Sequence, residues 1–137
     1  MIKVQDLSKR FPDLHQGEVV ALDGVSFSVA AGEVFGLLGP NGAGKTTSLR
    51  MLYGLMRPDG GRIEVDGVEV ASDPQAAQAR MGILPDSRGL YPRLTPREHL
   101  RYFGQLHQLA GTAPHTRIEK LVSLLQLRSI VERHADG

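Results

Sequence analysis

The sequence contains no cysteine and no tryptophan, and its formal net charge is only +1. Without cysteine, the chain has neither a disulfide framework nor thiolate chemistry. A nearly neutral chain gives no electrostatic reason to expect nucleic acid or an anionic membrane surface as a ligand. No apolar run approaches the ~20 residues that span a bilayer, and the N-terminus lacks the apolar core of a signal sequence. Any association with a membrane would therefore come through a partner.

The rest of the composition is ordinary for a globular protein, with 41% hydrophobic and 23% charged residues in a chain of 137. This length predicts one domain at most. The histidines show no spacing that is typical of metal ligands on a common face. We interpret them as surface residues or as residues with internal hydrogen bonds: His15, His99, His107, His115 and His134.

The most informative stretch is glycine-rich and matches the phosphate-binding pattern G-x-x-x-x-G-K-[ST]. Its residues are Gly39, Pro40, Asn41, Gly42, Ala43, Gly44, Lys45, Thr46 and Thr47. An apolar run at 34–38 precedes it and predicts a buried strand, while residues 45–53 predict a helix. By composition alone, the four fixed residues would occur in a chain of this length only roughly a few times in a thousand. A chance turn is therefore the weaker interpretation, and we predict a nucleotide-binding loop.

The residue types of this loop suit a polyphosphate. Glycine lets the backbone curl, with positive φ where needed, so that N–H groups line a concave anion site. The following helix adds unpaired N-terminal N–H groups and the positive end of its dipole. We assign Lys45 to the terminal phosphates, Thr46 to Mg²⁺, and Thr47 to a hydrogen bond with a phosphate oxygen.

Residues 1–90 alternate between strand and helix patterns, which predicts an α/β core with an antiparallel β portion. Besides the elements around the loop, we expect strands at 2–5, 19–29, 62–65, 68–70 and 82–85, and a helix at 74–80. A turn at Asp23–Gly24 would break the second strand, and Asp66–Gly67 predicts a tight hairpin turn. The runs at 34–38 and 82–85 are apolar, which is typical of strands buried within a sheet.

From Thr95 onward the pattern is helical. Residues 95–98 form a capping box with proline at the first helical position. Two apolar stripes at helical spacing then predict two packed helices. The first stripe is Leu100, Phe103, Leu106 and Ala110, and the second is Ile118, Leu121, Val122 and Leu125. Residues 127–137 give no consistent pattern.

Three phrases of the sequence together resemble the ATP-binding subunit of an ABC transporter. They are the glycine-rich loop, the segment 21–27 followed by Gly32 and Glu33, and the segment 84–91 (Leu-Pro-Asp-Ser-Arg-Gly-Leu-Tyr). The last phrase is most similar to the sodium- or drug-export branch of the family. The resemblance implies a P-loop NTPase fold, with an ATP-binding α/β core at 1–90 and the start of an all-helical subdomain at 91–137.

The resemblance also implies a function and a setting. In whole members of the family, two ATP-binding subunits close over two ATP molecules with Mg²⁺ and drive an integral membrane permease. They lie on the cytoplasmic face of the cell membrane, held there by that partner, and nucleic acid is not expected as a partner. Lys45 occupies the place of the lysine that takes part in ATP hydrolysis.

The resemblance covers essentially the whole chain, and it also shows what the chain lacks. Whole members continue with a Ser-Gly-Gly signature loop, an apolar strand that ends in Asp-Glu and a switch histidine, none of which occurs here. Glu132 and Asp136 do not end an apolar strand, so neither replaces the missing carboxylates. We therefore expect the N-terminal, truncated portion of a subunit, inactive in ATP turnover by itself.

Two further positions take their roles from the resemblance. Phe11 lies where the family has an aromatic residue that stacks on adenine, and the alternative is a core phenylalanine at a strand end. Asp86 lies where the family usually has a glutamine that reaches the Mg²⁺. An aspartate offers a shorter, charged oxygen ligand. The alternative for Asp86 is a residue that caps a helix or forms a turn.

Two other classes of protein stay open. A soluble ABC-type ATPase that acts on ribosomes or DNA would usually carry paired ATPase domains or a long coiled-coil insertion, and neither is visible here. A different P-loop enzyme, such as a small GTPase, would need the guanine-reading pattern Asn-Lys-x-Asp, which the chain lacks. The transported substrate depends on the membrane partner and is not encoded in this stretch.

Overall fold

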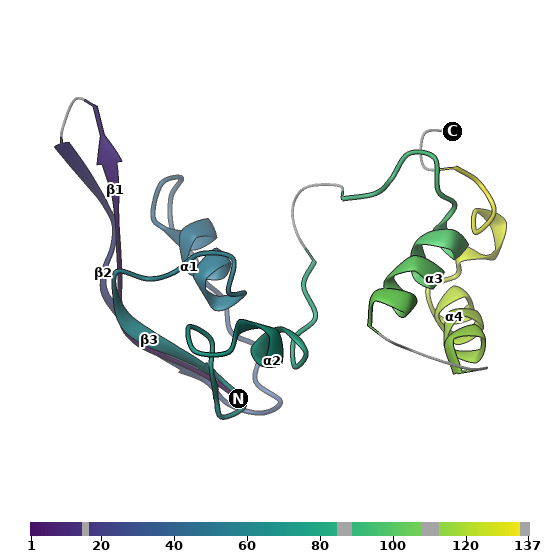
Figure 1. Ribbon diagram of the computed structural model, residues 1–137, viewed down its shortest axis with the longest axis horizontal. Helices are drawn as coiled ribbons and strands as arrows, with labels where there is room; N and C mark the ends of the chain where they lie inside the picture. Colours follow the sequence, from purple (N-terminus) through teal and green to yellow (C-terminus); the bar gives the residue numbers. More distant parts are fainter. Residues whose placement is uncertain (15–16, 85–88, 108–112, 135–137) are drawn as a thin grey trace. The chain divides into compact units, whose positions relative to one another are not determined.

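The computed structural model describes residues 1–14, 17–84, 89–107 and 113–134. It divides the chain into two compact units, Met1–Leu84 and Pro85–Gly137. The division falls a few residues before the boundary expected at residue 90. Figure 1 shows the strands and helices of the two units. Each unit has its own hydrophobic core.

The first unit is built on a four-stranded antiparallel sheet. Its strands are β1 (Ile2–Asp13), β2 (Gly17–Val29), β3 (Gly60–Val65) and β4 (Val68–Glu69), in the spatial order β2-β1-β3-β4. The predicted hairpin is confirmed: Val65 pairs with Val68, and Asp66–Gly67 turn at positive φ. β1 is much longer than the predicted strand at 2–5, because it pairs with β2 along one edge and with β3 along the other.

β2 is continuous where the sequence indicated a possible break at Asp23–Gly24. Between the pairs formed by Leu7 and Lys9, β2 carries one residue more than β1. The extra residue is absorbed in a bulge, where Gly24 has φ 62° and its N–H donates to Ser8 Oγ at 3.0 Å. A bulge bends and twists a strand without ending its pairing.

Two helices accompany this sheet, and α1 (Lys45–Leu52) packs on one of its faces (Figure 1). Met51 and Leu52 of α1 are 1% and 8% exposed. α2 (Pro74–Gln78) begins as predicted, with Asp73 accepting a backbone N–H of the first turn at 3.0 Å. The buried core shared by these elements consists of Val4, Leu7, Leu22, Met51, Leu52, Ile63, Val65, Val70 and Ala77.

The buried strand predicted at 34–38 is not formed. Residues 33–40 have no regular secondary structure, and Val34 and Leu38 are 98% and 92% exposed. Phe35 stays against the sheet, because its ring stacks on Phe27 of β2 with centroids 4.9 Å apart. A buried parallel strand needs neighbours that satisfy its backbone N–H and C=O groups. Among the described residues, no strand pairs with this run.

The short buried strand predicted at 82–85 is wrong for the same reason. Residues 81–84 have no regular structure, and Leu84 is 95% exposed. Within the described part of the chain, no strand supplies a partner for it. Pro85 and Asp86 lie outside the described residues, so the metal role of Asp86 stays a prediction.

The second unit is helical, as predicted. It contains α3 (Pro96–Leu106), α4 (Ala113–Leu124) and a short 3₁₀ turn, η1 (Leu127–Ser129). Its core is formed by Ile118, Val122 and Val131, with Leu100 and Leu127 packed against them. The predicted stripes are partly wrong, since Phe103, Leu106 and Leu125 are 46%, 59% and 58% exposed; Ala110 lies outside the described residues. In the described ranges of both units, no helix is long and apolar enough to cross a bilayer.

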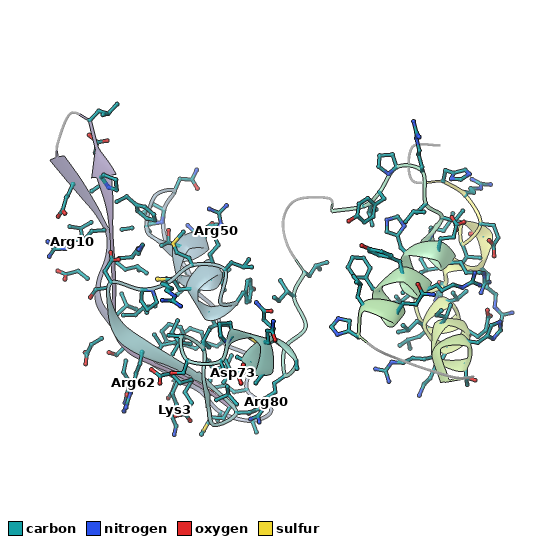
Figure 2. All side chains as sticks on the ribbon, in the orientation of Figure 1. Lys3, Arg10, Arg50, Arg62, Asp73 and Arg80 are labelled. Carbon is teal, nitrogen blue, oxygen red and sulfur yellow. The ribbon has the colours of Figure 1, made fainter. Side chains whose placement is uncertain are left out.

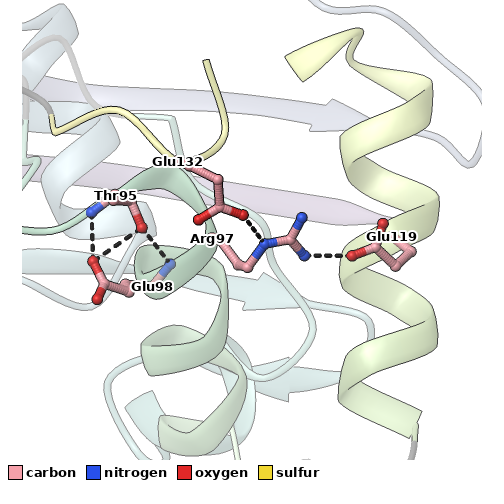
Figure 3. Close-up of polar contacts among 5 residues, drawn as sticks. All are labelled: Thr95, Arg97, Glu98, Glu119 and Glu132. Carbon is pink, nitrogen blue, oxygen red and sulfur yellow. Dashed lines mark hydrogen bonds and ion pairs between the residues drawn. The ribbon is translucent and has the colours of Figure 1, made fainter. Parts of the chain in front are cut away.

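Polar contacts define the start of α3 and join it to α4 (Figure 3). The predicted capping box is confirmed: Thr95 N–H donates to Glu98 Oε2 at 2.8 Å, and Glu98 N–H donates to Thr95 Oγ1 at 3.3 Å. These bonds hold the pKa of Glu98 below its usual value, with the Thr95 backbone N–H as the main cause. Arg97 donates to Glu119 of α4 and to Glu132, so one guanidinium links α3, α4 and the segment after η1.

His99 is buried and has internal hydrogen bonds. This is one of the two alternatives that the sequence indicated for the histidines, the other being a surface position. Its side chain is 6% exposed, Nδ1 lies 3.0 Å from the Thr95 carbonyl oxygen, and Nε2 lies 2.8 Å from the Tyr91 backbone nitrogen. A backbone N–H can only donate, so Nε2 is the acceptor and Nδ1 carries the proton. The His99 imidazole, with one protonated nitrogen, therefore links the Tyr91 backbone to α3.

Candidate functional site

The glycine-rich loop adopts the conformation that its glycines were predicted to allow. Gly42 and Gly44 lie in the left-handed region, with φ of 87° and 80°. An L side chain enters this region only with strain. Between them the chain folds back, and Ala43 N–H donates to the Pro40 carbonyl oxygen at 3.2 Å. The loop thus forms a tight turn directly before α1.

Gly44 is also the point where the loop rests on the sheet. It is buried, and a Cβ built on it would lie 2.4 Å from the Ala21 carbonyl oxygen and 2.8 Å from Leu22 Cδ2. Both atoms belong to β2, so this strand sets the position of the loop and of the first turn of α1. The sequence pattern explained glycine at this position by the approach of the backbone to a ligand. It did not predict the contact of Gly44 with β2.

The N-terminus of α1 forms the floor of the site. Gly44 is the N-cap residue and provides no side-chain cap, so the first N–H groups of the helix remain available to an anion. The helix dipole favours negative charge at the same place. Buried Ser48 donates its hydroxyl to the Gly44 carbonyl oxygen at 3.0 Å, which fixes the first turn. This geometry suits the phosphate binding that the sequence predicts.

Lys45 is folded back across the loop. Its Nζ donates to the carbonyl oxygens of Gly39 at 2.5 Å and Pro40 at 2.7 Å. These two hydrogen bonds hold the Lys45 ammonium against the backbone of the loop. An ammonium has three donors and no acceptor, so a phosphate oxygen can take the place of one carbonyl.

Two hydroxyls follow Lys45 on the first turn of α1. Thr46 is exposed and Thr47 is half-buried. A hydroxyl oxygen is a hard ligand of the kind that Mg²⁺ accepts, so exposed Thr46 fits the predicted metal role. Among the described residues, no group of three or more His, Asp or Glu side chains is placed to hold a metal ion.

Phe11 lies near the end of β1, opposite Val19 of β2, and is half-buried. Figure 2 shows the neighbouring Arg10 side chain pointing away from α1. Because side chains alternate along a strand, Phe11 and Lys9 face the side of the sheet that carries α1. Lys9 pairs with Leu22, the residue that lies against Gly44. The structure therefore brings Phe11 and the loop to one face of the sheet.

Lys9 and Asp59 lie beside Phe11, and neither is among the functional residues predicted from the sequence. Lys9 Nζ donates to Asp59 Oδ1 at 2.7 Å and lies 5.7 Å from the centroid of the Phe11 ring. This hydrogen bond, followed by one from the Arg10 backbone N–H, keeps the pKa of Asp59 below its usual value. The alternation of Leu7, Lys9 and Phe11 along one strand was the available signal for Lys9. Asp59 lies fifty positions away, and no local pattern points to it.

Comparison with known proteins gives a consistent result. The profile of the ABC transporter family matches residues 22–137. The chain is 41% identical over 138 residues to the ABC transporter ATP-binding protein NatA of Bacillus subtilis, covering 100% of this chain and 56% of that protein. It is 41% identical over 128 residues to the Nod factor export ATP-binding protein I of Burkholderia lata, covering 93% and 40%. It is 40% identical over 140 residues to the daunorubicin resistance ATP-binding protein DrrA3 of Streptomyces coeruleorubidus, covering 99% and 43%.

Solved structures agree with the sequence relatives. An ATP-binding subunit of an ABC transporter matches with a TM-score of 0.80 and 30% identity, over 98% of this chain and 54% of that chain. A dimeric ATP-binding cassette bound to ADP and Pi matches in fold, with a TM-score of 0.83 and 19% identity, over 99% and 62%. The predicted fold class is confirmed by these matches. The chain spans 40% to 56% of the length of the three curated relatives.

Proposed function

Because the chain belongs to the ABC transporter family of ATP-binding proteins, we propose that it binds MgATP and, within a whole subunit, couples ATP hydrolysis to a membrane exporter. The observation that carries the proposal is the loop at 39–47: Gly42 and Gly44 turn the backbone, and Lys45 lies across it at the start of α1. The export role rests on relatives that are named for Nod factor export and for daunorubicin resistance.

In this proposal each part of the nucleotide has its own residues. The phosphates lie against the loop and the first N–H groups of α1, and Lys45 and Thr47 donate to phosphate oxygens. Phe11 stacks on the adenine, because its ring is half-buried on the same face of the sheet as the loop. The residues in contact with phosphate are Gly39, Pro40, Asn41, Gly42, Ala43, Gly44, Lys45, Thr46 and Thr47.

Mg²⁺, when bound, neutralises charge on the terminal phosphates. Thr46 supplies the first protein ligand, and Asp86 supplies a second oxygen directly or through a water. An Asp86→Asn variant keeps the size of the side chain and removes its charge. The variant is expected to bind ATP more weakly with Mg²⁺ and more tightly with a chelator, since the carboxylate attracts the metal and repels bare phosphate. Calorimetric titration under both conditions tests this; unchanged affinities in both would make Asp86 a turn residue.

The partners in this proposal are a second ATP-binding subunit and an integral membrane permease. The similarity in fold to a dimeric cassette supports the first, and the transporter names of the relatives support the second. The permease would hold the subunit at the cytoplasmic face of the membrane. Nucleic acid is not part of the proposal, since a net charge of +1 gives no electrostatic argument for it.

Isothermal titration of the purified chain with MgATP tests the central proposal. We expect saturable binding to a single site, with inorganic tripolyphosphate binding more weakly because it cannot contact Phe11. GTP is a useful comparison, since the chain has no guanine-reading Asn-Lys-x-Asp. Absence of saturable MgATP binding at millimolar concentrations would overturn the proposed function.

We expect the chain of 137 residues to bind ATP without hydrolysing it. Phosphoryl transfer needs an oriented water and charge stabilisation on the far side of the γ-phosphate. The loop and α1 provide groups on the near side alone, and the sequence has neither a Ser-Gly-Gly loop nor an Asp-Glu pair. Phosphate release should equal that of a Lys45→Ala control, and steady release above that control would contradict the expectation.

A further inference from the structure

The inner face of β1 carries a lysine that is partly withdrawn from solvent. Leu7, Lys9 and Phe11 follow one another on the face that carries α1, and Leu7 is only 1% exposed. The side chain of Lys9 is 16% exposed, whereas that of Lys3, on the same strand, is 45% exposed. The ammonium at the end of this side chain has two partners.

Asp59 is the first of these partners and holds Lys9 in place. It lies in the loop directly before β3, and its two oxygens accept from Lys9 Nζ and from the Arg10 backbone N–H, both at 2.7 Å. Its own N–H donates to the Ser8 carbonyl oxygen at 3.0 Å. Three hydrogen bonds therefore fasten this loop to residues 8–10, just where the pairing of β3 with β1 ends at Gly60.

The ring of Phe11 is the second partner. Lys9 Nζ lies over it, 5.7 Å from the centroid, within the range of a cation–π contact. The ammonium therefore lies on one face of the ring. The ring keeps a second flat face, and adenine stacks on a flat apolar face of this kind.

We propose that Lys9 and Asp59 are positioning residues for the base of the nucleotide: the ion pair holds the Phe11 ring by one face, so that the other face receives adenine. The inference rests on the proposed ATP-binding function and deepens it. Neither residue is proposed to contact phosphate. Their effect is therefore confined to ligands that carry a base.

A double-mutant cycle with two ligands tests this inference. Lys9→Met keeps the aliphatic stem and removes the ammonium; it is combined with Phe11→Ala, and each protein is titrated with MgATP and with magnesium tripolyphosphate. Lys9→Met should weaken MgATP binding about two- to five-fold, the range of an exposed cation–π contact, and leave tripolyphosphate binding unchanged. In the Phe11→Ala background, Lys9→Met should have no further effect on MgATP.

Two further variants complete the experiment. Lys3→Met is the matched control, because Lys3 lies on β1 and pairs with Glu64 at 3.6 Å; it should leave both affinities unchanged. Asp59→Asn keeps the lysine but removes the charge that pairs with it and one of the two acceptor oxygens, and it should reproduce the selective loss of MgATP affinity. This second variant decides the question if Lys9→Met does not yield folded protein.

The outcomes separate this inference from the function on which it rests. Equal weakening of both ligands by Lys9→Met, or the same effect with and without Phe11, would overturn the positioning role while ATP binding stands. An unchanged MgATP affinity in Phe11→Ala would overturn the stacking role of Phe11 and the inference with it. Absence of MgATP binding by the unmodified chain would overturn the proposed function itself.

Discussion

Replacing Lys45 by alanine is expected to weaken MgATP binding by about tenfold or more. Lys45 is the cation held across the loop, where its Nζ donates to the Gly39 and Pro40 carbonyl oxygens. In the proposed complex with nucleotide, the same ammonium makes charge-assisted hydrogen bonds to phosphate, which contribute on the order of 1.5–3 kcal/mol. A loss of 1.4 kcal/mol corresponds to about a tenfold change in Kd. Isothermal titration of both proteins measures the difference.

Lys120→Ala provides the charge-matched control for this variant. Lys120 is an exposed residue of α4 and lies outside the glycine-rich loop, so its removal changes the net charge by the same amount and leaves the loop sequence intact. MgATP should bind to Lys120→Ala as it does to the unmodified chain. Tripolyphosphate should lose affinity for Lys45→Ala in the same proportion as ATP, because the lost contacts are to phosphate. Equal ATP affinity for Lys45→Ala and the unmodified chain would contradict the proposed role.

Gly44→Ala is expected to damage both the fold of the first unit and its nucleotide site. The new Cβ would lie 2.4 Å from the Ala21 carbonyl oxygen, which is fixed in β2, and φ is 80°. A left-handed alanine costs about 1–2 kcal/mol. The steric overlap adds to this, so we expect a loss of about 3 kcal/mol or more in the free energy of unfolding. ATP binding should fall as well, because relief of the overlap moves the loop away from β2.

Gly42→Ala separates the two causes. Gly42 also has positive φ, at 87°, but nothing lies within 4 Å of a Cβ built there. It should therefore show the conformational cost of about 1–2 kcal/mol alone. Urea unfolding of the two variants and the unmodified chain, followed by MgATP titration, gives the comparison. Equal losses of unfolding free energy in the two variants would show that the contact of Gly44 with β2 adds nothing to the conformational cost of alanine.

Local patterns in the sequence were sufficient for the elements that depend on near neighbours. The start of α1 at Lys45 follows from the glycine-rich loop, and the capping box at Thr95 and Glu98 forms as its residue types predict. The turn at Asp66–Gly67 closes its hairpin for the same reason. In each case the hydrogen-bonding partners lie within a few residues, so the sequence holds all the information needed.

Apolar runs were a weaker guide to strands. The runs at 34–38 and 82–85 have strand composition, yet Val34 and Leu84 are 98% and 95% exposed. A strand is stabilised by partners that lie far away in the chain, and composition does not reveal whether such partners are present. β1 shows the converse. Its outer half, up to Asp13, has no strong strand pattern, and it forms because β2 pairs with it along its full length.

The sequence by itself determined the family of the protein, the glycine-rich loop that we propose binds phosphate and the helix that follows, because the pattern formed by Gly44, Lys45 and Thr46 depends on residue type and spacing within one short segment. Only the tertiary structure decided what supports that segment and what accompanies it. Gly44 packs against β2, and Asp59 approaches Lys9 and Phe11. Both contacts join residues that are distant in the chain. Such contacts depend on strand register and on the path of the chain between strands, which spacing within a single segment does not encode.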